Sequence, residues 1–121
     1  MVRMTIPLPP VTKKNHQEIW RNGKTGKPFA VPSSQYREYE EAAGLFLQPL
    51  KIDYPVNVKA VYYMPTRRRV DLINLHSALH DVLVKAEVVE DDNCKIIVST
   101  DGSRVDYDKD NPRTEIEIRR V

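Results

Sequence analysis

The stretch RRRVDLINLHSALHDVLVKAEVVEDD, residues 67–92, constrains the fold most strongly because it sets a helical pattern between two charged segments. Apolar residues in it recur at helical spacing and form one stripe, made of Leu72, Leu75, Leu79, Val82, Leu83 and Ala86. A mostly polar second stripe borders the first. The pattern predicts an amphipathic helix with one face in the core, and Asp71 stands where an N-cap residue would.

The charges on either side of this helix indicate a chemistry. Arg67, Arg68 and Arg69 precede Asp71, and an acidic cluster of Glu90, Asp91 and Asp92 follows the helix. Arginines suit phosphate oxygens, whereas carboxylates repel phosphate unless a cation lies between them. The arrangement favours metal-assisted phosphodiester chemistry.

Asp71, Asp91 and Asp92 are therefore candidate catalytic residues and Mg²⁺ ligands, because Mg²⁺ prefers oxygen donors and a few carboxylates. Two alternatives stay open at this point. Asp71 can be a helix cap and nothing more, and Asp91-Asp92-Asn93 is also an ordinary turn sequence.

The composition describes one soluble domain. A chain of 121 residues with 40% hydrophobic and 30% charged residues is large enough for a core, and we expect a single domain over residues 1–121. No apolar run approaches membrane-spanning length, and the first residues lack a secretory signal pattern. Cys94 is the only cysteine, which excludes an intramolecular disulfide. We expect a cytoplasmic protein with no membrane partner.

Positive and negative charges are divided unevenly along the chain. Residues 1–70 carry 12 Lys/Arg and 5 Asp/Glu, whereas residues 71–121 carry 7 Lys/Arg and 12 Asp/Glu. This division suits a basic surface that leads into an acidic site, as in a nuclease. It suits equally well two halves that pair their charges across one fold.

The remaining patterns predict an α+β domain with a mixed or antiparallel sheet and two main helices. We expect strands over residues 2–8, 56–64, 95–100 and 114–121 and a hairpin formed by residues 18–21 and 28–31. We also expect a helix that begins near Pro32-Ser33-Ser34, with helical spacing toward Leu50 until Pro49 stops regular structure, and a polar, mobile segment over residues 103–112. In the hairpin, Trp20, Arg21 and Phe29 can pack together or stack on nucleic acid, and packing is the commoner role of two such aromatic residues.

Three weaker motifs favour ordinary structural roles. His76 and His80 are spaced for a shared zinc ion, but no glutamate follows His76, so we expect a surface or interface role. Cys94 has no base near it in the sequence. Four acids match positions 1, 3, 5 and 12 of a calcium-binding loop, yet the sixth position is not glycine, so a solvated loop is the better interpretation. These acids are Asp106, Asp108, Asp110 and Glu117.

Residues 67–92 also resemble the signature of the RusA family of Holliday junction resolvases, in which arginines precede Asp-Leu-x-Asn-Leu, Asp-x-Leu-x-x-Ala and a paired Asp-Asp. The matching residues are Arg67 to Arg69, Asp71, Leu72, Asn74, Leu75, Asp81, Leu83, Ala86, Asp91 and Asp92. The opening PLPPVTKKN resembles the basic loop of that family. The resemblance covers nearly the whole chain.

The resemblance implies a small homodimeric endonuclease of bacteria and their prophages that cuts four-way DNA junctions in recombination and repair. It implies Mg²⁺ as cofactor, with Mn²⁺ as a possible substitute, and Asp71 and Asp92 as metal-site aspartates with Asp91 beside them. Lys13, Lys14 and Arg67 to Arg69 would bind DNA phosphates. Because a four-way junction has two-fold symmetry, we expect a two-fold dimer with both Asp71 sites on one face.

Two positions depart from the family pattern. Ile73 stands where a second aspartate is usual, and Ser77 stands where a lysine is expected. Both losses should weaken metal or phosphate binding, although Asp81, Asp91, Glu90 or Lys85 could compensate. Junction binding is thus better supported than cleavage. The alternatives are a catalytically weak junction-binding protein and an unrelated α+β domain with a chance motif.

Overall fold

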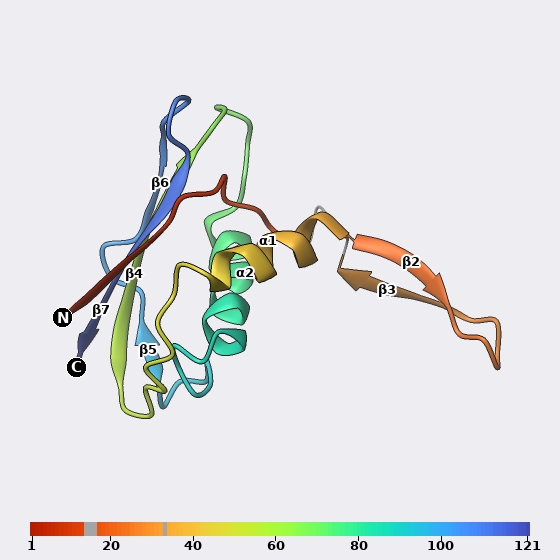
Figure 1. Cartoon of the computed structure of the whole chain (residues 1–121), viewed down its shortest axis with the longest axis horizontal. Coiled ribbons are helices and arrows are strands. Elements are labelled where there is room, and N and C mark those ends of the chain that lie inside the picture. The colour runs from red at the N-terminus through yellow and green to blue at the C-terminus, as the bar shows by residue number, and fades with distance from the viewer. Residues whose placement is uncertain (14–16, 33) are drawn as a thin grey trace.

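The computed structural model describes residues 1–13, 17–32 and 34–121 (Figure 1). Lys14 of the predicted basic loop lies outside these residues. The elements in chain order are β1 Val2–Ile6, β2 Gln17–Arg21, β3 Pro28–Pro32, α1 Ser34–Gly44, β4 Val56–Met64, α2 Leu72–Lys85, β5 Ile97–Ser99, β6 Arg104–Tyr107 and β7 Arg113–Arg120.

Five strands form one mixed sheet, which confirms the predicted α+β class. β4 runs through its centre, with β7 antiparallel on one side and β1 antiparallel to β7 beyond it. On the other side, β5 and then β6 pair with β4 in parallel. The side chain of Asn57 accepts a hydrogen bond from the backbone N–H of Asp101 at 2.8 Å, and the Ala60 N–H donates to Ser103 Oγ at 3.0 Å. These bonds hold the turn between β5 and β6 against the sheet.

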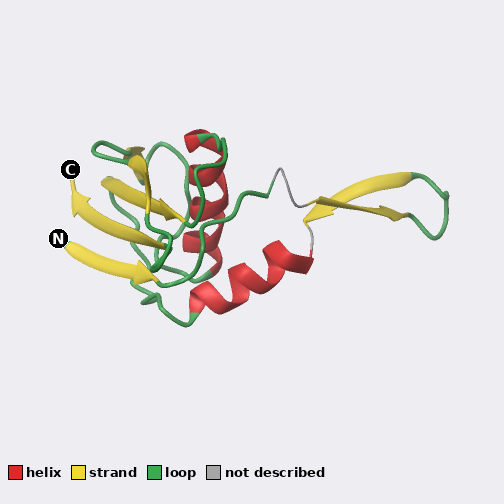
Figure 2. Cartoon of the chain, turned by 90° about the horizontal axis from the view of Figure 1, so that it is seen from above, coloured by secondary structure: helices red, strands yellow, loops and turns green. Residues whose placement is uncertain are grey.

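Both helices lie on one side of this sheet, where the core is (Figures 1 and 2). Leu75, Leu79, Val82 and Leu83 of α2 are buried, so the predicted stripe does face the core. Leu72 and Ala86, at its two ends, are half-buried. The sheet contributes the residues of β1, β4 and β7 whose side chains alternate inward, including Ile6, Val58, Ala60, Tyr62, Ile116 and Ile118.

Helix α1 is shorter than predicted. It ends at Gly44, and the following N–H groups of Leu45 and Phe46 bond carbonyls three residues back, at 3.2 and 3.0 Å, which tightens and closes the last turn. Leu45 is 84% exposed and Phe46 is 45% exposed, so the spacing that suggested a helix toward Leu50 does not mark a buried face. Glycine has low helix propensity, which favours a stop here.

Strand β6 occupies part of the segment that was predicted to be polar and mobile. Its residues Arg104, Val105 and Asp106 are all exposed, so no alternation of apolar and polar residues indicated a strand. Its order comes instead from backbone pairing with β4, from Val61↔Arg104 to Met64↔Tyr107. β5 is also shorter than predicted, because residues 94–96 form a turn.

The hairpin is confirmed. β2 and β3 pair antiparallel with each other and form a separate two-stranded sheet that extends away from the body (Figure 1). In the described parts of the chain, no helix has the length and apolarity needed to span a bilayer.

We expect Leu83→Ala to lower the free energy of unfolding by about 2–5 kcal/mol, because Leu83 is fully buried between α2 and the sheet and its truncation leaves a cavity. The matched control on the same helix is Ile73→Ala, where the side chain is 73% exposed and the expected change is within about 0.5 kcal/mol. Urea denaturation measures both. Equal losses in the two variants would contradict the packing described.

Candidate nucleic-acid and metal site

The three arginines lie in the loop that joins the end of β4 to the start of α2. Arg67, Arg68 and Arg69 are all exposed. The Arg67 guanidinium lies 4.2 Å from the centre of the Tyr107 ring, within cation–π range. The Asp108 N–H donates to the Met64 carbonyl at 2.9 Å, which ties the end of β6 to the end of β4. β6 therefore supports the loop that presents the arginines.

Asp71 occupies the N-cap position of α2, but its carboxylate does not cap the helix. Its backbone is extended, with φ −90° and ψ 127°, and its side chain makes no capping hydrogen bond. One carboxylate oxygen accepts a bond from the Asn74 side-chain amide at 3.3 Å, and the residue is exposed. Capping alone therefore does not explain Asp71, and its carboxylate is accessible to a cation.

Asp91 and Asp92 differ in what their side chains do. Asp91 accepts the Asp92 N–H at 2.7 Å on one oxygen and the Asn93 amide at 2.9 Å on the other. The Asp92 N–H, followed by the Asn93 amide, holds the pKa of the Asp91 carboxyl below its ordinary value. Asp92 is exposed, and its negative charge partly offsets the lowering of the His80 pKa that burial causes. Asp91 thus shapes the loop, while Asp92 presents a carboxylate to solvent.

The candidate carboxylates lie at the two ends of α2 rather than together. Asp71 precedes the helix, and Asp91 and Asp92 follow it in the loop that packs near Asp53 at the other end of the sheet (Figure 1). A helix of 14 residues is about 21 Å long. Among residues 1–13, 17–32 and 34–121, no group of three His, Cys, Asp or Glu side chains is close enough to hold a metal ion.

Two residues that could have compensated for the missing aspartate and lysine are already engaged. Asp81 forms an ion pair with Lys13, so this basic residue is held against α2. Lys85 donates to Glu40 at 2.8 Å, and that hydrogen bond raises the pKa of Lys85. Glu90 is exposed and lines a shallow hollow of about 480 Å³ at the end of α2.

His76 is packed inside the protein, which corrects the surface role expected for it, whereas His80 is half-buried. His76 is 7% exposed, and its Nδ1 lies 2.7 Å from the Tyr62 hydroxyl. His80 stacks on His76, with ring centres 5.6 Å apart, and its Nε2 is buried with no partner among the described residues. Burial lowers the pKa of both imidazoles, and the charges of Asp92 and Asp81 partly offset this at His80.

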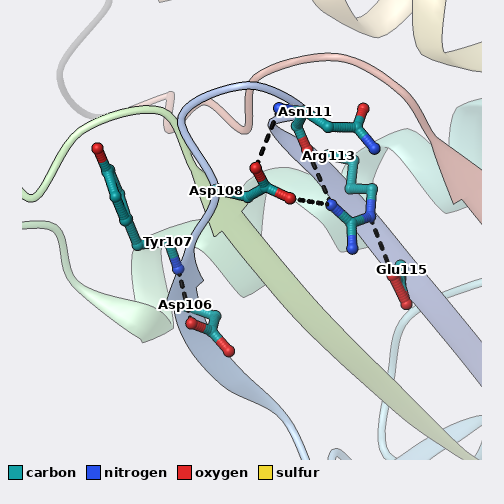
Figure 3. Close-up of polar contacts among 6 residues, drawn as sticks. All are labelled: Asp106, Tyr107, Asp108, Asn111, Arg113 and Glu115. Atoms are coloured by element: carbon teal, nitrogen blue, oxygen red, sulfur yellow. Dashed lines mark hydrogen bonds and ion pairs between the residues drawn. The ribbon is translucent and has the colours of Figure 1, made fainter.

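Arg113 organises the acidic turn that had matched a calcium-binding loop (Figure 3). Its guanidinium binds Asp108 at 2.9 Å and Glu115 at 3.0 Å, and it lies 3.8 Å from the centre of the Tyr63 ring. The bond from Arg113 holds the pKa of the Asp108 carboxyl below its ordinary value. Of the four acids in that match, Asp108 pairs with Arg113, Asp106 with Arg104 and Glu117 with Arg3, so three of these carboxylates face basic side chains of the same chain.

Tyr107 is the contact that the sequence pattern did not indicate. It ends β6, in the segment that lacks apolar periodicity, and it supports Arg67 only because β6 returns beside β4. A lone tyrosine between acidic residues gives no signal of this pairing. A parallel strand contact across more than 40 positions is not readable from local spacing.

Comparison with known proteins identifies the family of this chain. A family model described as endodeoxyribonuclease RusA matches residues 7–119. A curated relative, the crossover junction endodeoxyribonuclease RusA of Aquifex aeolicus (strain VF5), is 34% identical over 91 residues, which cover 75% of this chain and 71% of the relative. The match defines the class as an endodeoxyribonuclease. The chain belongs to the RusA family.

We expect the free energy of unfolding to fall as the pH drops from about 7.5 to about 5.5. Burial lowers the pKa of His76 and His80 below the ordinary 6.5, so the unfolded chain binds more protons in this range. The stabilisation that comes from the neutral imidazoles is complete above their pKa in the unfolded chain. It is lost as the pH falls through their lower pKa in the folded protein. Denaturation at several pH values measures it.

In that series, His80→Leu should make the pH dependence shallower, whereas Ser77→Ala, an exposed change on the same helix, should leave the slope as in the wild type. An unchanged slope in the His80→Leu protein would show that the His80 imidazole of the wild type does not contribute to the pH dependence of stability.

Proposed function

We propose that this protein is a Mg²⁺-dependent endonuclease that binds and resolves four-way DNA junctions. The proposal rests on the exposed carboxylate of Asp71, which makes no capping bond and lies two positions after the last of three exposed arginines. This arrangement leaves negative and positive side chains side by side without mutual neutralisation. Phosphate and a divalent cation together would satisfy both. Membership of the family and the name of the Aquifex relative support the same activity.

The donor chemistry fits magnesium. Mg²⁺ usually keeps several waters and binds one or two carboxylates together with substrate phosphate, so a preformed group of three carboxylates is not required. Asp71 and Asp92 are both exposed and supply hard oxygen donors, and Asp91 holds the loop that presents Asp92. When bound, the ion would act as a Lewis acid on the phosphate. Mn²⁺, with similar ligand preferences, is the expected substitute.

A two-fold dimer would bring the two ends of α2 together. Because Asp71 and Asp92 lie at opposite ends of one helix, two antiparallel copies of α2 would set Asp71 of one protomer near Asp92 of the other. The outward positions Ile73, Ser77 and Val84 follow a helical spacing and are exposed or half-buried, which suits such a contact. We propose that each site is shared between the protomers of a homodimer.

The arginines would hold the DNA rather than cleave it. Arg68 and Arg69 have exposed side chains without a partner among the described residues, and Arg67 is oriented by Tyr107. Contacts to backbone phosphates carry little sequence information and depend strongly on salt. Lys13 would join them only by exchanging its ion pair with Asp81 for a phosphate. Lys14 belongs to the same proposal by its place in the sequence.

A catalytically weak junction-binding protein is the second candidate. Ile73 and Ser77 are both exposed at the start of α2, so the missing aspartate and lysine are not replaced by other groups at those positions. The binding surface does not depend on them. This candidate predicts tight junction binding with little cleavage, and the experiments below separate the two.

Asp71→Asn and Asp92→Asn should each lower the rate of junction cleavage on the order of a hundredfold or more, because each removes a charged oxygen donor. Junction binding should stay the same or become tighter, since a charge that repels phosphate is lost. Gel-shift and single-turnover cleavage assays measure both. The control is Asp110→Asn, an exposed aspartate in the turn before β7. Normal cleavage by Asp71→Asn would refute the assignment.

Mixing inactive Asp71→Asn and Asp92→Asn proteins should restore cleavage if the site is shared. A mixed dimer would contain one site with both carboxylates intact and one with neither, whereas sites built within single chains would leave none intact. Subunits are exchanged before assay, and light scattering verifies the dimer mass. Restored nicking supports a shared site. Absence of nicking in a verified mixed dimer would contradict it.

Ile73→Asp should lower the Mg²⁺ concentration needed for half-maximal cleavage, because it adds a carboxylate one turn from the arginines and close to Asp71. An acidic residue also suits the first turn of a helix. Ile73→Asn, with similar size and no charge, is the matched control. The proposal of a weakened metal site fails if the two variants give the same metal titration as the wild type.

A further inference from the structure

The β2–β3 hairpin, with its turn at residues 22–27, is not explained by the core or by the site. It forms its own sheet and extends from the body on the side of α1, away from the main sheet (Figures 1 and 2). Residues 21–28 are all exposed. A hairpin of two strands is only marginally stable by itself. An extension whose tip buries nothing in its own chain is suited to contact something else.

The tip is ordered by its own hydrogen bonds. The Asn22 side chain accepts the N–H groups of Lys24 and Thr25 at 2.8 and 3.2 Å, and the Gly26 N–H donates to the Asn22 carbonyl at 2.8 Å. Gly26 has φ +70°, a conformation that glycine adopts without strain. The tip therefore holds Lys24 and Lys27 in a fixed turn rather than in a loose loop.

The charge of the hairpin indicates which kind of molecule it binds. The hairpin, residues 17–32, contains Arg21, Lys24 and Lys27 and one acidic residue, Glu18 in β2. The lysines of the tip are exposed, and Arg21 reaches the Gly26 carbonyl at 3.2 Å, which places a third cation by the same turn. Three cations around one turn, with no acidic residue in positions 19–32, form the electrostatic pattern of a phosphate-binding element. A surface for an apolar partner would not concentrate charge in this way.

We propose that this hairpin is a second DNA-binding element. It binds backbone phosphates on a duplex arm of the junction, outside the stretch of DNA that Arg67 to Arg69 contact. The proposal rests on the proposed function and extends it. A strand of five residues spans about 17 Å, so the tip reaches well outside the body, and a two-stranded ribbon is narrow enough to follow a DNA groove. Lys24 and Lys27, with Arg21, make the phosphate contacts.

The test is the salt dependence of DNA binding by the double variant Lys24→Gln/Lys27→Gln, measured by fluorescence anisotropy on a four-way junction and on a linear duplex. Loss of two phosphate contacts should lower the slope of log K against log salt by about 1.8 and weaken binding on the order of tenfold near 0.1 M salt. Both effects should appear on both DNAs, because the proposed contact is to an ordinary duplex arm.

Two further variants make the result specific. Lys51→Gln/Arg119→Gln removes the same charge from exposed positions of the body. This variant should change the slope of log K against log salt by less than about half as much as the hairpin variant does. Lys24→Arg/Lys27→Arg keeps the charge and should bind as the wild type does. Circular dichroism confirms that all variants fold.

The outcomes separate this proposal from the proposed function. Equal slopes for the wild type and the Lys24→Gln/Lys27→Gln protein on both DNAs would overturn the hairpin contact and leave junction cleavage untouched. A wild type that neither prefers nor cuts junctions would overturn the proposed function, while the duplex measurement would still decide the hairpin contact. If the variant instead changed mass by light scattering, the hairpin would be a contact between copies of the chain, and the DNA contact would be wrong.

Discussion

The structure depends on the packing of one face of α2 against the central strands β4 and β7. Leu75, Leu79, Val82 and Leu83 bury this face, and their removal from water supplies a large part of the stability of so small a domain. The same helix carries Asp71 before its first turn and the loop with Asp92 after its last. Packing that is needed for folding therefore also fixes where the candidate carboxylates lie.

The charges around α2 divide into those that the chain neutralises and those that it leaves open. Arg113 is surrounded by Asp108, Glu115 and the Tyr63 ring, and Lys85 is paired with Glu40. Arg68 and Arg69 and the carboxylate of Asp92 have no such partners among the described residues. Charged side chains that have no oppositely charged partner within the fold are expected at a site that binds another molecule.

The sequence predicted those parts of the fold that have a local period. The stripe of α2, the alternation of Ile116 and Ile118 and the turn of the hairpin all follow from spacing and turn chemistry. β6 could not be predicted in this way, because its exposed residues have no period and its position depends on pairing with a strand far away in the chain. The end of α1 at Gly44 was missed because Phe46 and Leu50 continue the spacing without being buried.

The candidate site was predictable in its residues but not in its geometry. Types and order of residues identified Asp71, Asp91, Asp92 and the arginines, since carboxylates and guanidinium groups have specific uses near phosphate. Spacing placed a helix between Asp71 and Asp92, but it could not reveal that the two carboxylates stay apart within one chain. Nor could it reveal that Asp91 is occupied by its own loop, or that His76 is buried between α2 and β4.

Junction resolution is tested most directly by mapping the cuts that the purified protein makes in a synthetic four-way junction with Mg²⁺ or Mn²⁺. A two-fold, metal-dependent junction resolvase should make paired nicks at symmetric positions in opposite strands, require the added metal and cut a linear duplex of the same sequence very little. Tight binding without nicks at any metal concentration would contradict the nuclease assignment and support the binding protein, and equal cutting of junction and duplex would contradict junction selectivity.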